Sequence, residues 1–228
     1  REVLVQERIY HSMTSFLTSL GLRASHKLLD FDCGSLRSGK LFIPYLNKGN
    51  YYGLDPNKWL VEDGIDNELG KDILKIKKPN FSYNDNFKID FNEKFDFIVA
   101  QSIFSHTSLN LAKKGLSSIF ESLNDNGIAL FTFVEGRDDY KGNEDWVYPN
   151  CTTFKYKTIK TTLNETGAEW RRLFWFHPAA TWFIMSKNKR NIPSYFDIFF
   201  LLGGEEVLSK QYQSQKFISN RIFSFLKK

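Results

Sequence analysis

Two kinds of apolar pattern alternate along the chain, and this alternation limits the fold more than any other feature. Short runs rich in branched and aromatic residues, such as "KLLDF" at 27–31 and "KFDFIVAQS" at 94–102, are typical of buried strands. Between such runs, apolar residues recur at intervals of three and four, as in "SLNLAKKGLSSIFESL" at 108–123, which indicates amphipathic helices. Strands alternating with helices predict an α/β fold around a mostly parallel sheet.

The same reading extends over most of the sequence. Helices are expected at 8–20, 38–46, 56–64, 66–78, 108–123 and 155–167. Strands are expected at 27–31, 50–55, 80–84, 94–102 and 128–134, with the chain broken at "NDNG" before the last of them. "AEWRRLFWF" and "TWFIMSK", joined by "HPAA", predict an antiparallel pair. The fold class that follows is a doubly wound sheet with helices on both faces and a reversed C-terminal edge.

Residues suited to binding a ligand follow the first two expected strands. Doubly wound sheets bind ligands at the carboxyl ends of their central strands. The loop "DFDCGSLRSG" after the first strand contains Gly34 and Ser35, which let backbone N–H groups approach a ligand closely. Asp55 ends the second strand, 21 residues past Gly34 (55 − 34), a spacing suited to accepting hydrogen bonds from ribose hydroxyls. The two features together predict a site for an adenosine-containing cofactor.

These motifs, with "YYGLDPNKWL", "KFDFIVAQSIFSHT" and "NDNGIALFTF", resemble the class I S-adenosylmethionine-dependent methyltransferases. The resemblance is to the subgroup whose first loop reads Gly-Cys-Gly-Ser-Leu-Arg, and it covers roughly residues 20–187. It implies a Rossmann-like sheet, S-adenosylmethionine as cofactor and transfer of a methyl group to an acceptor. The family's last two strands form the same reversed edge that is expected here.

Carried over position by position, the resemblance implies a set of cofactor-binding residues. Residues 32–35 would wrap the methionine part, Asp55 would hold the ribose, and Asp85 would accept from the adenine amine. Gln101 and Ser102 would face the sulfonium end. The full set is Asp30, Asp32, Cys33, Gly34, Ser35, Asp55, Pro56, Asn57, Asp85, Asn86, Phe87, Gln101 and Ser102.

Asp32 departs from the family pattern, which has glycine at this position. Aspartate is among the residues that tolerate left-handed backbone angles, so the turn can survive the change. Its charge would either repel the carboxylate of the cofactor or pair with its ammonium. We expect a modest loss of cofactor affinity. Cys33 in the same loop is expected to be a small packing residue and not a nucleophile.

Methyl transfer from a sulfonium needs an aligned acceptor and, for weak nucleophiles, a group that removes a proton. His106, just after the strand at 94–102, is the candidate catalytic base; the alternative is a histidine at a helix start. His177 is expected to shape the rim of the pocket. The segment 135–152 is either a lid over the acceptor or a solvated connection.

Composition excludes several other classes. The net charge of +5 is mild and the basic residues occur in short groups, so a nucleic-acid partner is not expected. Two distant cysteines and four scattered histidines give no metal-ligand spacing, so we expect no metal site. The start of the chain lacks a signal-peptide pattern and the apolar run at 198–202 is too short to span a bilayer. A cytoplasmic protein acting on a small-molecule acceptor is the expectation.

Residues 1–189 are expected to form the methyltransferase domain, including an N-terminal helix at 1–21. Residues 190–228 are expected to form a helical extension that packs on the domain or on a partner subunit, with "FISNRIFSFLKK" as its amphipathic part. Two other functions stay open. One is a methyltransferase-like binding domain that no longer catalyses, and the other is a dinucleotide-dependent oxidoreductase. The second would need G-x-G-x-x-G, of which "DCGSLR" offers one glycine.

Overall fold

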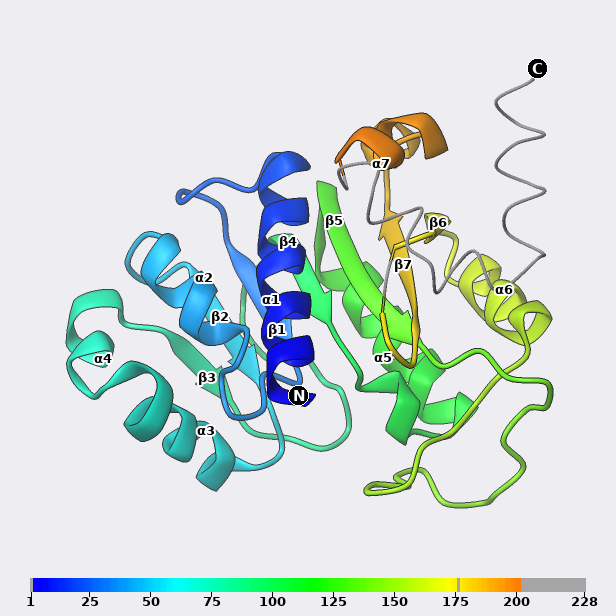
Figure 1. Cartoon of the computed structure of the whole chain (residues 1–228), viewed down its shortest axis with the longest axis horizontal. Helices are drawn as coiled ribbons and strands as arrows, with labels where there is room; N and C mark the ends of the chain where they lie inside the picture. The colour runs from blue at the N-terminus through cyan, green and yellow to red at the C-terminus, as the bar shows by residue number, and fades with distance from the viewer. Residues whose placement is uncertain (1, 176, 202–228) are drawn as a thin grey trace.

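A seven-stranded sheet forms the centre of the molecule in the described part of the chain (Figure 1). The computed structural model describes residues 2–175 and 177–201, without the side chains of residues 2–9, 199 and 200. The strands lie in the order β3-β2-β1-β4-β5-β7-β6. They are β1 (Leu28–Phe31), β2 (Tyr51–Leu54), β3 (Asn80–Ser82), β4 (Phe95–Ala100), β5 (Leu123–Phe133), β6 (Glu169–Leu173) and β7 (Thr181–Ser186).

Strand directions agree with the fold class expected from the sequence. The strands β1 to β5 pair in parallel, whereas β7 pairs antiparallel with both β5 and β6. The strand order reverses direction at β1, with β2 on one side and β4 on the other, so the carboxyl ends of β1 and β4 flank the crevice where such sheets bind ligands. The Rossmann-like architecture with a reversed edge is confirmed.

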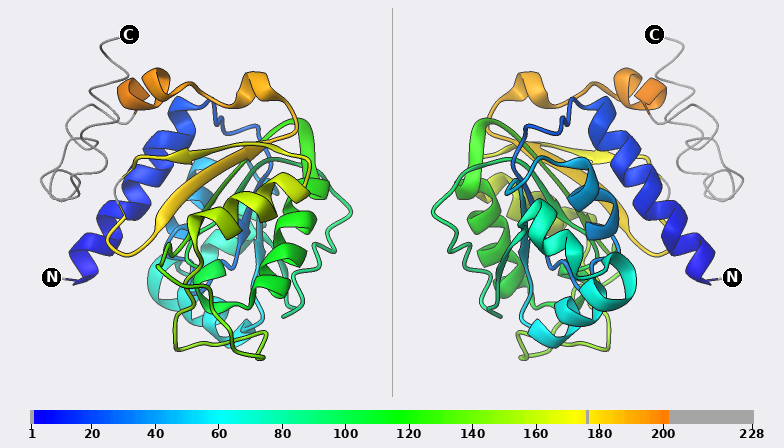
Figure 2. Two further views of the ribbon diagram at one scale, coloured as in Figure 1. Left: turned by 90° about the vertical axis from the view of Figure 1, so that its right-hand side faces the viewer. Right: turned by 90° about the vertical axis from the view of Figure 1, so that its left-hand side faces the viewer.

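Helices cover both faces of the sheet (Figure 2). Side chains of α1 (Glu2–Ser19), α2 (Gly39–Tyr45) and α3 (Lys58–Gly64) pack in the cluster on one face. Those of α5 (Leu109–Ser122) and α6 (Tyr156–Glu165) pack in the cluster on the other. The remaining helical elements are the π-helical turn η1 (Ile65–Leu69), α4 (Asp72–Lys77), the 3₁₀ turns η2 (Phe104–His106) and η3 (Lys189–Asn191), and α7 (Tyr195–Leu201).

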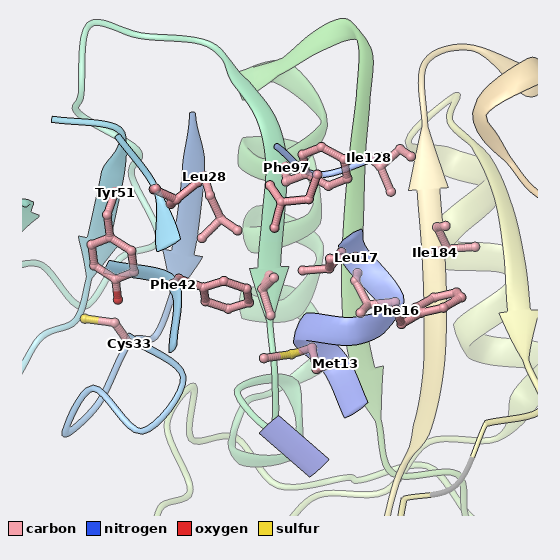
Figure 3. Packing of buried hydrophobic residues seen from close by; sticks show 14 of the residues in the cluster. Met13, Phe16, Leu17, Leu28, Cys33, Phe42, Tyr51, Phe97, Ile128 and Ile184 are labelled. Atoms are coloured by element: carbon pink, nitrogen blue, oxygen red, sulfur yellow. The ribbon is translucent and has the colours of Figure 1, made fainter. Parts of the chain in front are cut away.

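Alternation along the strands divides the core into two layers. On β4, Phe97 and Val99 face the layer beneath α1, whereas Ile98 and Ala100 face α5. Figure 3 shows Met13, Phe16 and Leu17 of α1 lying against the first of these layers. Because both faces are covered, the near-continuous apolar run of β4 has a partner for every side chain.

Two expected elements differ in the structure. The single helix expected at 66–78 is divided, because Gly70 takes a φ of 82° and separates η1 from α4. The chain break expected at "NDNG" lies inside β5, whose pairing with β4 shifts between Phe95–Leu123 and Phe97–Ile128. The polar residues 124–127 therefore bulge out of a strand that continues on both sides.

The C-terminal extension is described only at its start. It contains η3 and α7, in which Ile198 is buried in the same layer as α1. The expected amphipathic segment at 217–228 lies outside the described residues. Among the helices that the structure describes, none has the length and apolar character needed to cross a bilayer.

Helix α3 packs directly on the loop after β1. A Cβ added at Gly64 would lie 2.3 Å from the carbonyl oxygen of Ser35, so only glycine fits between the helix and the loop. The loop is therefore held from one side by a backbone contact that allows no side chain.

Gly64→Ala tests this contact. We expect it to lower the free energy of unfolding by about 1–3 kcal/mol, because the loop or the helix has to shift to admit the methyl group. Urea denaturation measures the loss. Lys58→Ala, on the exposed side of the same helix, is the control and is expected to change stability by less than about 0.5 kcal/mol. Equal stability of the two variants would contradict the close packing.

Candidate functional site

The loop after β1 turns sharply at the carboxyl edge of the sheet. Asp32, Gly34 and Leu36 have positive φ values of 72°, 53° and 59°. The N–H groups of Asp32 and Cys33 donate to the carbonyl oxygen of Leu54 at 2.8 and 3.1 Å, which ties the loop to the end of β2. Asp32 thus adopts the left-handed conformation that aspartate tolerates better than most residues other than glycine, as expected from the sequence.

Asp30 lies beneath this loop and is only 3% exposed. Its Oδ2 accepts from the Ser38 hydroxyl at 2.5 Å and from the Tyr51 hydroxyl at 2.8 Å. Burial raises the pKa of Asp30 to about 6, although the two hydrogen bonds oppose this shift. Through these bonds Asp30 links β1 to β2 and to the start of α2. The sequence analysis did not predict its two partners, Ser38 and Tyr51.

Asp55 connects the end of β2 with the glycine of the loop. Its Oδ2 accepts from the N–H of Gly34 at 2.8 Å, and its Oδ1 accepts from the N–H of Asn57 at 2.7 Å. The residue is 1% exposed. The structure therefore brings together Gly34 and Asp55, as the sequence spacing predicted. Pro56 and Asn57, beside them, are exposed.

Asp32 and Asp55 form a pair of carboxyl groups at this edge. The pKa of Asp32 lies well above its ordinary value, first because the group is desolvated and then because Asp55 repels its charged form and hydrogen-bonds to it. Asp30 adds a smaller repulsion. The arrangement favours a neutral Asp32 that donates a hydrogen bond to Asp55.

Two further residues complete this part of the site. Cys33 is buried, and burial raises the pKa of its thiol well above the ordinary value, as expected for a packing residue. Tyr83, which sequence reasoning missed, directly follows β3 and is half-exposed. Its pKa is raised by partial burial and by the neighbouring Cys33, Glu62 and Asp55. The position just past the carboxyl end of a parallel strand was the signal for Tyr83.

The expected adenine-side residues separate into two kinds. Asp85 and Asn86 are exposed on the loop after β3. Phe87 is 4% exposed, and its ring lies 5.0 Å from that of Phe31, centre to centre. Phe87 supports the loop from within the core, whereas Asp85 and Asn86 are accessible to a ligand.

Gln101 and Ser102 lie past the end of β4, as expected, and both are partly buried. Ser102 has a φ of 65°, and its N–H donates to the Thr132 hydroxyl at 2.7 Å. Gln101 Nε2 donates to the Ser102 hydroxyl at 3.3 Å. Thr132 of β5, which sequence reasoning missed, therefore stabilises the turn that presents both residues at the crevice.

His106 is held in one tautomer. Its Nδ1 lies 2.8 Å from the carbonyl oxygen of Asn150. A carbonyl oxygen only accepts, so Nδ1 carries the proton and the neutral ring keeps a lone pair on Nε2. The Tyr148 ring contacts the imidazole edge-on at 5.2 Å. His106 can therefore accept a proton at Nε2, which is what a general base needs.

His177 is held in the opposite tautomer. Its Nδ1 accepts from the N–H groups of Ala179 and Ala180 at 3.2 and 2.9 Å, so its neutral ring carries the proton on Nε2. Burial lowers the pKa of His177 to about 4, which keeps the ring neutral at physiological pH. His177 is suited to donate a hydrogen bond and not to remove a proton.

The segment 135–152 is hydrogen-bonded to neighbouring elements on both sides of the exposed residues 141–144. Asp139 accepts from the N–H of Lys155 at 2.7 Å and from the Thr158 hydroxyl at 2.9 Å, and so ties the segment to the start of α6. Further along, the N–H of Val147 donates to the carbonyl oxygen of His106 at 2.9 Å. It is therefore more than a solvated connection. In the described part of the chain, no group of three or more His, Cys, Asp or Glu side chains is arranged to hold a metal ion.

Comparison with solved structures relates this fold to methyltransferases. Magnesium protoporphyrin IX methyltransferase from Synechocystis PCC 6803, solved with bound S-adenosylmethionine, matches with a TM-score of 0.62 and 13% identity, over 81% of each chain. An S-adenosylmethionine-dependent methyltransferase from Clostridium acetobutylicum matches with a TM-score of 0.58 and 12% identity, over 78% of this chain and 91% of that one.

The glycopeptide N-methyltransferase MtfA, solved with S-adenosylmethionine, matches with a TM-score of 0.59 and 9% identity, over 78% of this chain and 93% of that one. No protein-family model and no curated protein sequence matches the chain. At these identities the likeness establishes the fold: this chain has the Rossmann-like fold of the methyltransferases that it matches.

The two tautomers can be tested directly. In ¹⁵N spectra of histidine-labelled protein at neutral pH, we expect the neutral His106 ring to carry its proton on Nδ1 and the His177 ring to carry it on Nε2. Protonated and bare ring nitrogens are distinguishable by their chemical shifts, and His106→Gln and His177→Gln assign the signals. A proton on Nε2 of neutral His106 would contradict the hydrogen bond to Asn150.

The carboxyl pair predicts a pH dependence of stability. The pKa of an aspartate in an unfolded chain is about 4. Above that pH the folded chain retains the proton of Asp32 that the unfolded chain has lost, so the free energy of unfolding falls as the pH rises towards the raised pKa. Asp30 contributes in the same direction up to about pH 6.

Asp32→Asn is expected to flatten this decline, because the variant has no proton to retain at position 32. Chemical denaturation from pH 4 to 8 gives the free energy of unfolding of the variant, which is compared with that of the wild type at each pH. Asp63→Asn, at an exposed position of α3, should follow the wild type. Parallel curves for Asp32→Asn and the wild type would refute the raised pKa.

Proposed function

We propose that this chain binds S-adenosylmethionine at the carboxyl ends of β1 to β4 and transfers its methyl group to a small-molecule acceptor. The observation that carries the proposal is the Asp55–Gly34 hydrogen bond, which closes the loop after β1 onto β2 at the crevice of the sheet. Solved structures with the same fold contain S-adenosylmethionine or S-adenosylhomocysteine. The residue types at the crevice suit an adenosyl group.

Asp55 is the proposed ribose ligand, with Pro56 and Asn57 beside it. Each oxygen of an ionised carboxylate has two lone pairs, so Asp55 can accept from ribose hydroxyls while it retains its bonds to Gly34 and Asn57. Residues 32–35 would hold the methionine part. Asp85 and Asn86 would contact the adenine, with Phe87 beneath them.

The chemistry requires little of the protein beyond alignment. The bound cofactor would supply an electrophilic methyl group. Gln101 and Ser102 lie at the end of β4, where they would face the sulfonium end. His106 would take the acceptor's proton on Nε2, because Nδ1 donates to Asn150 and the imidazolium that forms keeps this hydrogen bond.

Asp32 is the residue that opposes this function. A cofactor whose ribose lies against Asp55 has to displace the Asp32 carboxyl group from Asp55 or bind beside it. An ionised Asp32 would repel the carboxylate of the cofactor, whereas a neutral one would not. The Asp32–Asp55 contact favours one second candidate, a methyltransferase-like binding domain without catalytic activity.

Calorimetric titration with S-adenosylmethionine and S-adenosylhomocysteine tests cofactor binding. We expect saturable binding by the wild type and at least a tenfold loss, about 1.4 kcal/mol, in Asp55→Asn, which cannot accept as many hydrogen bonds as a carboxylate. Asp63→Asn removes an exposed carboxylate of α3 and should bind as the wild type does. No binding of either ligand at millimolar concentration would contradict the proposal.

Asp32→Gly distinguishes the two candidates. The variant restores the residue type that the family pattern has at this position and removes one carboxyl group. Unchanged affinity would indicate a site adapted to aspartate and would favour the enzyme. A gain of a hundredfold or more, about 2.7 kcal/mol, would indicate a site that has lost its cofactor and would favour the non-catalytic domain.

A further inference from the structure

Residues 145–152, called here the bridging segment, pair with the turn that contains His106. The N–H of Val147 donates to the carbonyl oxygen of His106 at 2.9 Å, and the N–H of Thr152 donates to that of Ser105 at 2.7 Å. Thr107 and Trp146 form an antiparallel bridge next to the first of these bonds, and the N–H of Ser108 donates to the carbonyl oxygen of Asp145 at 2.8 Å on its other side. The bridging segment thus runs beside the turn after β4 like a short strand.

The bridging segment also contacts the loop after β3. The indole N–H of Trp146 donates to the carbonyl oxygen of Asp85 at 2.9 Å, and the Trp146 ring lies 5.1 Å from that of Phe87. Phe87 is buried against Phe31 of β1 and Phe104 of η2. Trp146 therefore sits between the adenine side of the proposed cofactor site and the turn after β4.

Three residues of the bridging segment contact the His106 ring: Tyr148, Asn150 and Cys151. The Asn150 carbonyl oxygen holds the proton on Nδ1, and the Tyr148 ring contacts the imidazole edge-on. If the bridging segment moves, the hydrogen bond that sets the tautomer of His106 is lost. The position of the proposed base therefore depends on the hydrogen bond between Trp146 and the carbonyl oxygen of Asp85, because this bond holds the bridging segment in place.

We propose that the bridging segment couples the adenine side of the cofactor site to His106, with Trp146 as the positioning residue. This inference rests on the proposed function, because it requires an adenosyl group at the loop that contains Asp85. A ligand there restricts the motion of the Asp85 backbone. The hydrogen bond from Trp146 to Asp85 then restricts the bridging segment, which in turn holds His106 in position. Such coupling is reciprocal: fixing the bridging segment also favours the ligand.

Cys151 supplies a reporter that needs no knowledge of the acceptor. It is exposed within the bridging segment, and its Sγ lies 3.9 Å from Nδ1 of His106. The only other cysteine in the sequence, Cys33, is buried. Because its Sγ contacts the His106 ring, the rate at which an aromatic disulfide reagent labels Cys151 reports on how closely the bridging segment is held to His106, and Cys151→Ser gives the background rate.

We expect saturating S-adenosylhomocysteine to slow the labelling of Cys151 by about fivefold or more. Trp146→Phe keeps an aromatic ring beside Phe87 but removes the N–H donor. In this variant the product should still bind, and the slowing should fall below about twofold. Trp170→Phe is the matched control, because Trp170 donates its indole N–H to Asn164 in a different part of the fold, at 2.9 Å. It should keep the full protection.

The outcomes separate the two proposals. If calorimetry detects no binding of S-adenosylhomocysteine, the proposed function fails and the coupling fails with it. If the product binds but labelling of Cys151 is unchanged, only the coupling is overturned. Full protection in Trp146→Phe would also overturn it, because the ligand would then shield Cys151 directly.

A measurement on the wild-type chain makes the test independent of how well the variants fold. In ¹⁵N spectra, S-adenosylhomocysteine should shift or sharpen the His106 ring signals. His26 precedes β1, at the opposite end of the strands from the proposed site. Its Nδ1 accepts from the N–H of Arg23, and its signals should not change. Unchanged His106 signals at saturating product would contradict the coupling.

Discussion

The rest of the site depends on the two hydrogen bonds that the Asp55 carboxylate accepts. It accepts one backbone N–H from the loop after β1 and one from the start of α3. Charge-assisted hydrogen bonds of this kind are among the stronger ones in proteins. They hold the loop in a conformation with several left-handed residues, against which Gly64 of α3 packs without room for a methyl group. One side chain thus sets the shape of the crevice at the switch point of the sheet.

The same carboxylate limits what else the site can hold. Burial and repulsion by the neighbouring Asp55 raise the pKa of Asp30 and of Asp32, so ionising either group has a cost. A proton on Asp32 lowers this cost and also lowers the repulsion that an anionic ligand would meet. Asp32 therefore fits the left-handed turn of the loop, and its charge state would affect the binding of an anionic ligand there.

The sequence predicted the sheet because period and strand length are local properties. The runs at β1, β2 and β4, the helix at α5 and the reversed edge were each readable from a short window. Gly34 and Asp55 could be paired because parallel strands align their carboxyl ends. The division at Gly70 and the bulge at 124–127 were missed, since each depends on how the neighbouring element packs.

Contacts between distant loops could not be read from the sequence. Trp146 and Asp85 are 61 residues apart, and their hydrogen bond carries no local signal. His106 was recognisable as a polar residue after a strand, but its tautomer depends on a carbonyl oxygen 44 residues away. Phe87 shows the same limit: its packing against Phe31, more than 50 residues earlier in the chain, has no local signal in the sequence.

A crystal structure with S-adenosylhomocysteine tests the central claim most directly, because it locates the adenosyl group without needing the acceptor. The account predicts ribose hydroxyls within hydrogen-bond distance of Asp55 and the adenine beside Asp85, with the Trp146–Asp85 bond retained. Product bound away from the carboxyl ends of β1 and β2, or a ribose that makes no contact with Asp55, would contradict it.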